Sequence, residues 1–140
     1  QAEAPHYAVV SDLIGDALAE GHETLATLNT VVLRAVCSYL GIPTPIVAAS
    51  SLPLDLPEQC AAGEWALHIS KRLGATEYRN AAGGRGLFSD EFFANHGITL
   101  SFHEHHPRKY TTGSFDFVDN LSVIDWMMWN DRDTLHAWLG

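Results

Sequence analysis

The chain has 140 residues, of which 46% are hydrophobic, and this is enough for one folded domain with a real core. Its net charge of −9 argues against non-specific binding of nucleic acid, because the 8 Lys and Arg residues form no basic stripe that could neutralise phosphates. No apolar run reaches about 18 residues and no signal peptide is recognisable, so we expect a cytoplasmic protein without a membrane span. Because the chain begins with Gln1 rather than Met, we also expect it to be a fragment of a longer protein.

The first third of the chain predicts two helices and a short strand. Apolar residues recur at helical spacing over residues 9–18 and 25–39, and Gly41 followed by Pro43 ends the second helix. The run Ile46–Ala49 is short and apolar, which is typical of a buried strand in a parallel sheet.

The remainder predicts helices alternating with two further strands. The helices are expected at residues 58–73, over the segment SDEFFANH capped by Ser89 or Asp90, from a cap at Asn120 through Trp129, and after a cap at Asn130 or Asp131. The strands are expected at residues 76–80 and 98–103. Apolar and polar residues alternate over residues 98–103, as in a strand.

Strands that alternate with helices imply right-handed crossovers and a parallel sheet. We therefore predict a single α/β domain over residues 1–140, with a three-layer type of arrangement in which a short parallel sheet of about three strands is flanked by helices.

Ligands of open parallel sheets bind beyond the carboxyl ends of the strands. The three predicted strand exits are Ser50–Ser51, Asn80–Gly86 and His103–His106, all of them polar, and we expect them to converge at one edge. In the second exit, the run Gly83-Gly84-Arg85-Gly86 could form a backbone nest for an anion, with Arg85 as a fork-shaped partner for phosphate or carboxylate. The alternative interpretation is an ordinary tight turn.

The histidines after the last strand allow three interpretations. The alternation places His103 and His105 on one face, where either could act as a general base near neutral pH, oriented by Glu104 or Asp125. The same pair could bind a divalent metal, with further ligands from His106, Asp90 or Asp125. The histidines could also be polar residues of a solvated strand end.

Asp125 is the most informative carboxylate of the sequence. It shares a helix face with Leu121 and Met128 at spacings i, i+4 and i+7, and a carboxylate on an apolar face needs a partner. Arg85, Lys109 or a histidine could be that partner, and a helix-locking ion pair or hydrogen bond is the simplest role. The nearby tryptophans and phenylalanines are interpreted as packing residues.

Several segments resemble the WbqC-like protein family. LGATEYRNAAGGRG, FSDEFFANHGI, a strand ending in HHP, and NLSVIDWMMWN are similar to the C-terminal half of the family pattern, and APHY, ETLATLNTVVLRAVCSYLGI and TPIVAASSLPL extend the similarity over nearly the whole chain. A family segment resembling Q..Y.PW.GYF has no counterpart here. Where the family usually has Ser-Gly after the tyrosine strand, this chain has Arg79-Asn80-Ala81, and Tyr110 comes one residue later than the family tyrosine.

The resemblance implies a transferase of bacterial surface-polysaccharide (O-antigen, lipopolysaccharide) biosynthesis that acts on an activated sugar or an acyl donor. It favours His106 as the proton acceptor, with Asp125 orienting it or holding a substrate amine. The substrate-binding residues that it implies, together with the strand-exit argument, are Arg85, Gly84, Asn80, Ser122, His103, His105 and Tyr110.

Two other function classes remain open. One is a non-catalytic accessory or interaction domain, and the other is a metal-dependent hydrolase built on His103 and His105. The expected partner is a small molecule rather than nucleic acid or membrane, with self-association as a further expectation, and the sequence identifies no cofactor.

Overall fold

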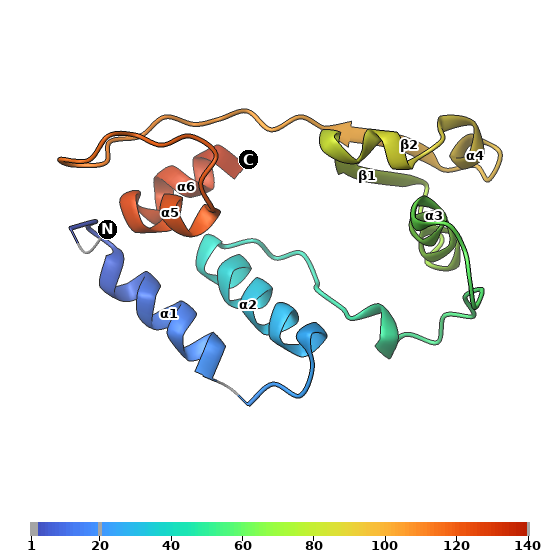
Figure 1. Ribbon diagram of the computed structural model, residues 1–140, viewed down its shortest axis with the longest axis horizontal. Coiled ribbons are helices and arrows are strands. Elements are labelled where there is room, and N and C mark those ends of the chain that lie inside the picture. Colours follow the sequence, from blue (N-terminus) through green and yellow to red (C-terminus); the bar gives the residue numbers. More distant parts are fainter. Residues whose placement is uncertain (1–2, 20, 140) are drawn as a thin grey trace. The chain divides into compact units, whose positions relative to one another are not determined.

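A computed structural model of the chain describes residues 3–19 and 21–139. Backbone contacts divide the chain into two compact units, Gln1–Ala48 together with Pro107–Gly140 (unit 1) and Ala49–His106 (unit 2). Figure 1 shows the helices and strands of each unit. The expectation of a single domain stays a prediction, and the two units are described separately.

Unit 1 is helical, with α1 (Tyr7–Ala19), α2 (Leu25–Leu40), α5 (Val123–Trp129) and α6 (Arg132–Leu139). The Thr24 hydroxyl caps α2 by accepting a hydrogen bond from the Thr27 N–H at 3.1 Å. Gly41 ends the helix in the left-handed conformation at φ 71°, which a glycine adopts without strain. Both predicted N-terminal helices are therefore confirmed.

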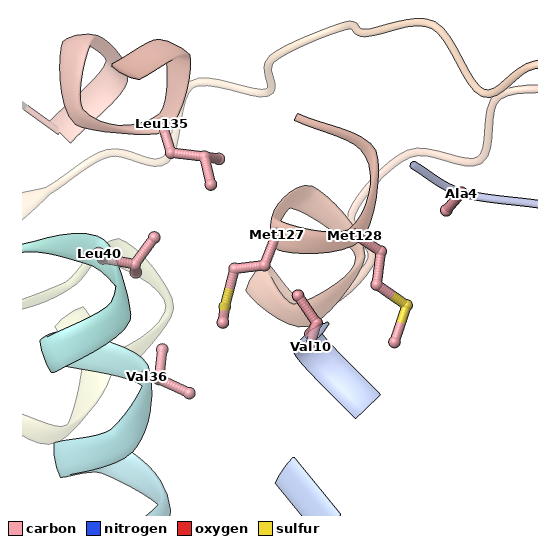
Figure 2. Packing of buried hydrophobic residues seen from close by; sticks show 7 residues of the cluster. All are labelled: Ala4, Val10, Val36, Leu40, Met127, Met128 and Leu135. Carbon is pink, nitrogen blue, oxygen red and sulfur yellow. The ribbon is translucent and has the colours of Figure 1, made fainter. Parts of the chain in front are cut away.

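The core of unit 1 joins residues from the two ends of its sequence. Figure 2 shows its buried side chains, which come from all four helices and from the segment before α1: Ala4, Val10, Val36, Leu40, Met127, Met128 and Leu135. The His6 N–H also donates to the Met128 carbonyl at 3.0 Å, so the N-terminal segment is tied to α5 by its backbone. The tryptophans Trp126, Trp129 and Trp138 pack against this core, as predicted.

Unit 2 contains the 3₁₀ helices η1 (Ala49–Ser51) and η2 (Ala82–Leu87), helices α3 (Ala62–Arg72) and α4 (Asp90–Ala94), and strands β1 (Glu77–Ala81) and β2 (Thr99–His103). The two strands pair in parallel, in a register that runs from Glu77 opposite Thr99 to Ala81 opposite His103. Helix α3 packs against β1 and α4 against β2, and the core consists of Leu67, Phe93 and Ile98 with aromatic rings around them.

The α/β class with a short parallel sheet flanked by helices is confirmed, but the predicted number of about three strands is not. Among the residues that the structure describes, the sheet has two strands. Ile46–Ala49 is not a strand, because residues 42–48 have no regular structure and Ala49 begins η1. Pro43 and Pro45 withhold backbone N–H groups from any ladder there, and Val47 is 55% exposed rather than buried.

The caps of the C-terminal helices are partly as predicted. Asn120 does not cap α5; it takes a left-handed φ of 58° before the helix, and the Ser122 hydroxyl caps it by accepting from the Ile124 N–H at 3.3 Å. Asp131 does cap the last helix, because its Oδ1 accepts from the Thr134 N–H at 2.8 Å. In the described ranges, no helix combines the length and the apolar character that crossing a bilayer requires.

Candidate functional site

The carboxyl ends of β1 and β2 lie side by side, since Ala81 and His103 are opposite each other in the last pair of the register. The chain leaves β1 through Asn80, whose Nδ2 donates to the Tyr78 hydroxyl at 2.8 Å and whose Oδ1 accepts from the Ala81 N–H at 2.7 Å. Gly84 then packs against the same amide, because a Cβ there would lie 3.1 Å from the Asn80 Oδ1. Asn80 thus holds η2 against the end of the strand.

Arg85 projects from η2 onto β2. Its guanidinium carbon lies 4.2 Å from the centroid of the Phe102 ring, in a cation–π contact. The side chain is exposed and forms no ion pair with any residue in the described part of the chain. A guanidinium stacked by its face keeps its in-plane N–H groups for an anion. The structure therefore brings the second and third predicted exits together, while the first, Ser50–Ser51, does not follow a strand.

The histidines lie at and beyond the end of β2, and all three are exposed. His103 is the last residue of the strand, and His105 and His106 follow in a segment without regular structure, so the strand alternation stops before His105. It stops there because the partner strand β1 ends at Ala81. Within the described residues of either unit, no group of three or more His, Cys, Asp or Glu side chains is arranged to hold a metal ion.

Unit 1 contains a buried carboxylate with a phenol donor. Asp125, in the first turn of α5, is 6% exposed, and the Tyr110 hydroxyl donates to its Oδ2 at 2.5 Å. Burial, followed by the hydrogen bond and charge of Asp125, raises the pKa of Tyr110 above its ordinary value. One partner of Asp125 is thus a neutral phenol, which was not among the partners that the sequence suggested. A phenol supplies a hydrogen bond without burying a second charge.

Asp125 also lines a cavity of about 200 Å³ in unit 1. The walls are largely apolar, with two carboxylates among them: Thr112, Phe115, Asp116, Val118, Leu121, Asp125 and Trp129. The rings of Phe115 and Trp129 meet edge to face at a centroid distance of 6.3 Å. Gly113, at φ 60°, lies against the Trp129 ring, since a Cβ there would be 3.4 Å from it. Trp129, which the sequence predicts to be a packing residue, also forms part of this wall.

Ser122 positions Asp125 rather than lining the cavity. The Ser122 hydroxyl caps α5, and the Ser122 carbonyl accepts a hydrogen bond from the Asp125 N–H at 2.9 Å. The two unit 1 residues that the sequence assigned to substrate binding, Ser122 and Tyr110, therefore contact Asp125 from its backbone and its side chain. The sequence named all three residues but did not predict that they meet.

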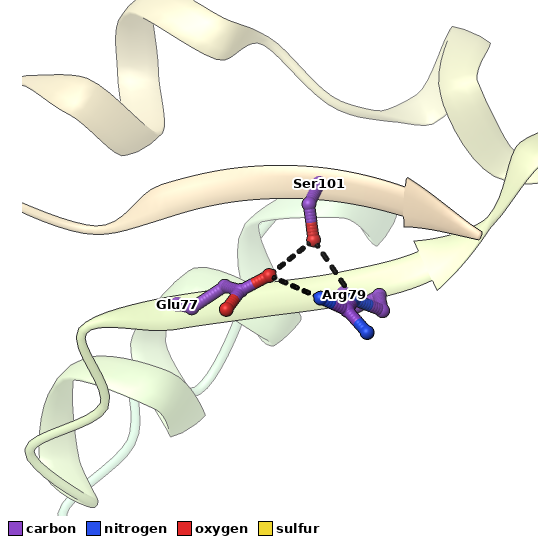
Figure 3. Close-up of polar contacts among 3 residues, drawn as sticks. All are labelled: Glu77, Arg79 and Ser101. Carbon is purple, nitrogen blue, oxygen red and sulfur yellow. Dashed lines mark hydrogen bonds and ion pairs between the residues drawn. The ribbon is translucent and has the colours of Figure 1, made fainter. Parts of the chain in front are cut away.

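A polar network on β1 and β2 was missed by the sequence reasoning. Ser101 and Arg79 both donate to the Glu77 Oε1, at 2.6 and 3.0 Å, and the Arg79 Nε–H donates to the Ser101 hydroxyl at 3.2 Å. Figure 3 shows these three contacts. The Ser101 hydrogen bond, and then Arg79, lower the pKa of Glu77. The signal was the alternation that places Glu77 and Arg79 on one strand face. Because the network is exposed, we interpret it as a register contact rather than a site.

Comparison with known proteins identifies relatives of this chain. The model of the WbqC-like protein family matches residues 1–137. The uncharacterised protein Rv1507c of Mycobacterium tuberculosis is 29% identical over 124 residues, which are 87% of this chain and 52% of that protein. The chain therefore spans about half the length of the curated relative that it matches. No solved structure matches the chain. With nearly all of its residues matched by the family model, the chain belongs to the WbqC-like protein family.

Proposed function

We propose that this protein is a group transferase of bacterial surface-polysaccharide (O-antigen) assembly, acting on an activated sugar or an acyl donor. The observation that carries the proposal is the buried Asp125 carboxylate, held by Tyr110, in the wall of a largely apolar cavity. Small-molecule sites are typically apolar cavities with a few fixed polar groups, and this cavity has that composition.

The cavity suits an amino sugar or a similar polyol. Asp125 accepts a hydrogen bond from the substrate's amine or hydroxyl group, and Tyr110 fixes the carboxylate in position for it. The exposed ring of Phe115 and the ring of Trp129 offer apolar surface to the carbon face of a sugar. Ser122 acts indirectly, by starting the helix that carries Asp125.

Unit 2, considered by itself, carries the donor-binding and proton-accepting groups of the proposal at the ends of its strands. Arg85 and the η2 segment around Gly84 bind the phosphate or carboxylate of the donor, and Asn80 holds η2 against the strand. His103, at the end of β2, and His105, two residues later, are assigned to the same donor site. In the proposed transfer, an amine or hydroxyl of the acceptor attacks the electrophilic carbon of the donor bound at these strand ends, a new bond forms to that carbon, and the leaving group departs with its electron pair. His106 accepts the proton that the attacking group loses.

The test is a product assay on the full chain. Nucleotide-activated amino sugars are incubated with acyl thioesters, and products are measured by mass spectrometry for the parent and for His106→Ala, Asp125→Asn and Asp133→Asn. We expect His106→Ala to lower turnover by about 100-fold or more, because general bases contribute that much. Asp125→Asn should raise KM more than it lowers kcat, and Asp133→Asn, an exposed acid on α6, should match the parent.

Three results would contradict the proposal. Full activity of His106→Ala would show that His106 is not the general base. Stable capture of a partner protein, with no product from any donor, would favour the accessory domain. A stoichiometric metal in the purified protein that is lost on replacing His103 and His105 would favour the hydrolase.

A further inference from the structure

Unit 2 contains a second cavity, of about 550 Å³, that no role above uses. It is lined by residues of α3 and of the segment before it: Asp55, Leu56, Pro57, His68, Lys71 and Arg72. This volume is within the range of small-molecule sites. None of these residues belongs to the transferase site proposed above, so what the cavity binds is a separate question.

The α3 wall of the cavity is basic. His68, Lys71 and Arg72 are spaced i, i+3 and i+4, which makes them neighbours on one face of the helix. The last turn of a helix favours cations through the helix dipole, and this accounts for Lys71 and Arg72 being there. It does not account for an imidazole and two cations lining the same cavity in a chain of net charge −9.

Of the two cations, one is held in an ion pair, and the other has no charged partner among the residues that the structure describes. The Arg72 Nη2 pairs with the Asp55 Oδ2 at 2.7 Å, which leaves its other N–H groups for a ligand. Lys71 forms no ion pair with any residue in the ranges that the structure describes. With two cations and one carboxylate, the wall keeps one surplus positive charge, and the His68 ring adds a hydrogen-bonding group.

We propose that this cavity binds a phosphate-bearing small molecule. Lys71 contributes a point charge to the phosphate, and Arg72 contributes N–H groups in a fixed plane. A phosphate group displaces only a few waters of about 30 Å³ each, so most of the cavity remains for an attached organic group. Leu56 and Pro57 provide the apolar surface on which that group lies.

The experiment measures binding of inorganic phosphate and of ADP to the full chain by isothermal titration calorimetry. ADP serves as a phosphate ester with an attached ring system, and the two probes separate free phosphate from an ester. We expect both to bind, with ADP at least about tenfold tighter because of its contacts with the apolar wall. Binding is read without turnover, so the result stands apart from the transferase assay.

Three variants of the full chain test the assignment. Lys71→Met should weaken ADP binding at least about tenfold, since a charge-assisted contact is lost. Asp55→Asn should tighten it about threefold, because a competing carboxylate is removed from an exposed ion pair. Lys109→Met, the same charge change at an exposed lysine in unit 1, should leave it unchanged.

The opposite signs of the first two variants cannot both arise from misfolding, and circular dichroism of each variant confirms the fold. Equal weakening by Lys71→Met and Lys109→Met would overturn the proposal, since the attraction would then be non-specific. Weaker binding in Asp55→Asn, or no binding of either probe at millimolar concentration, would overturn it as well.

Discussion

The two units place their polar contacts in opposite environments. Unit 1 holds the hydrogen bond from Tyr110 to Asp125, a carboxylate that is 6% exposed, in the wall of a largely apolar cavity. Unit 2 displays three bonds among Glu77, Arg79 and Ser101 on an exposed strand face. Water competes for the exposed network and can replace its bonds, whereas water reaches a buried carboxylate less readily when a donor is lost. Burial therefore matters more than the number of bonds.

The hydrophobic cores of the two units differ in the kinds of side chain that they contain. Unit 1 packs aliphatic and methionine side chains from four helices, so its stability is spread over many contacts. Unit 2 has only two strands and depends on a small aromatic cluster, in which the Tyr78 ring lies 5.5 Å from the rings of both Phe88 and Phe93. Losing one ring should therefore cost unit 2 more than losing its whole polar network.

The largest expected effect comes from Phe93→Ala. Phe93 is 1% exposed at the centre of the cluster, and such truncations cost about 3–5 kcal/mol. The free energy of opening unit 2, from amide hydrogen exchange of β1 and β2, measures the loss. Leu87→Ala is the control, because Leu87 is 64% exposed in the same unit and its loss should cost far less. Equal losses would show that the aromatic cluster is not what holds unit 2.

Tyr110→Phe should have a smaller effect, in unit 1. Removing the phenol hydroxyl takes a donor from a charged acceptor, which costs about 2 kcal/mol. Urea denaturation, followed by the fluorescence of the unit 1 tryptophans, measures the change. Tyr7→Phe changes the same hydroxyl at an exposed residue of α1 and should be close to neutral. If the two variants had equal stability, the buried bond would have no special weight.

The same pair predicts a loss of stability at high pH. Burial and Asp125 raise the pKa of Tyr110, so the folded chain keeps a proton that the unfolded chain releases near pH 10. The contribution is therefore fully present below about pH 10 and falls as the pH rises towards the raised value. Urea titrations over this pH range should show a steeper decline for the parent than for Tyr110→Phe. Identical slopes would contradict the assigned hydrogen bond.

The smallest effect is expected from Glu77→Gln. The pKa of Glu77 is lowered by Ser101 and Arg79, so its contribution is present above the ordinary glutamate value and is lost as the pH falls through the lowered one. The variant should therefore unfold with a shallower acid dependence and differ little at neutral pH. Glu91→Gln, an exposed acid of α4, is the matched control. A large loss at neutral pH would reverse the ranking of buried and exposed contacts.

The spacing of apolar residues predicted the secondary structure well where that spacing is long and regular enough to determine a strand or a helix. The alternation over residues 98–103 predicted a strand, and the structure has β2 at Thr99–His103, with Ile98 in the core of unit 2 and Leu100 packed against it. The predicted strand at Ile46–Ala49 was wrong, because four apolar residues do not specify a strand unless a neighbouring strand pairs with them. The cap of α5 shifted from Asn120 to Ser122 because several residues in a row could serve, and only backbone geometry selects one.

The sequence identified residues of the candidate site, but it did not predict which of them contact one another. The apolar helix face around Asp125 indicated that its carboxylate needs a partner. Opposite charge suggests a cation as that partner, and nothing in the sequence singles out the phenol of Tyr110. The contact of Arg85 with Phe102 depends on the strand register, which the sequence does not specify for so small a sheet. The transferase roles of His106, Asp125 and Arg85 stay predictions for the assays above.

The division of the sequence has a consequence for the order in which the chain can fold. Unit 2 is one continuous segment inserted within unit 1, so its contacts are close in sequence. During synthesis on the ribosome, α1 and α2 emerge early, but the core that buries Val10 and Leu40 needs Met127 and Leu135 from the far end. The nascent chain can thus complete unit 2 first, while the apolar residues of α1 and α2 that pack on α5 and α6 stay without those partners until the two later helices are made.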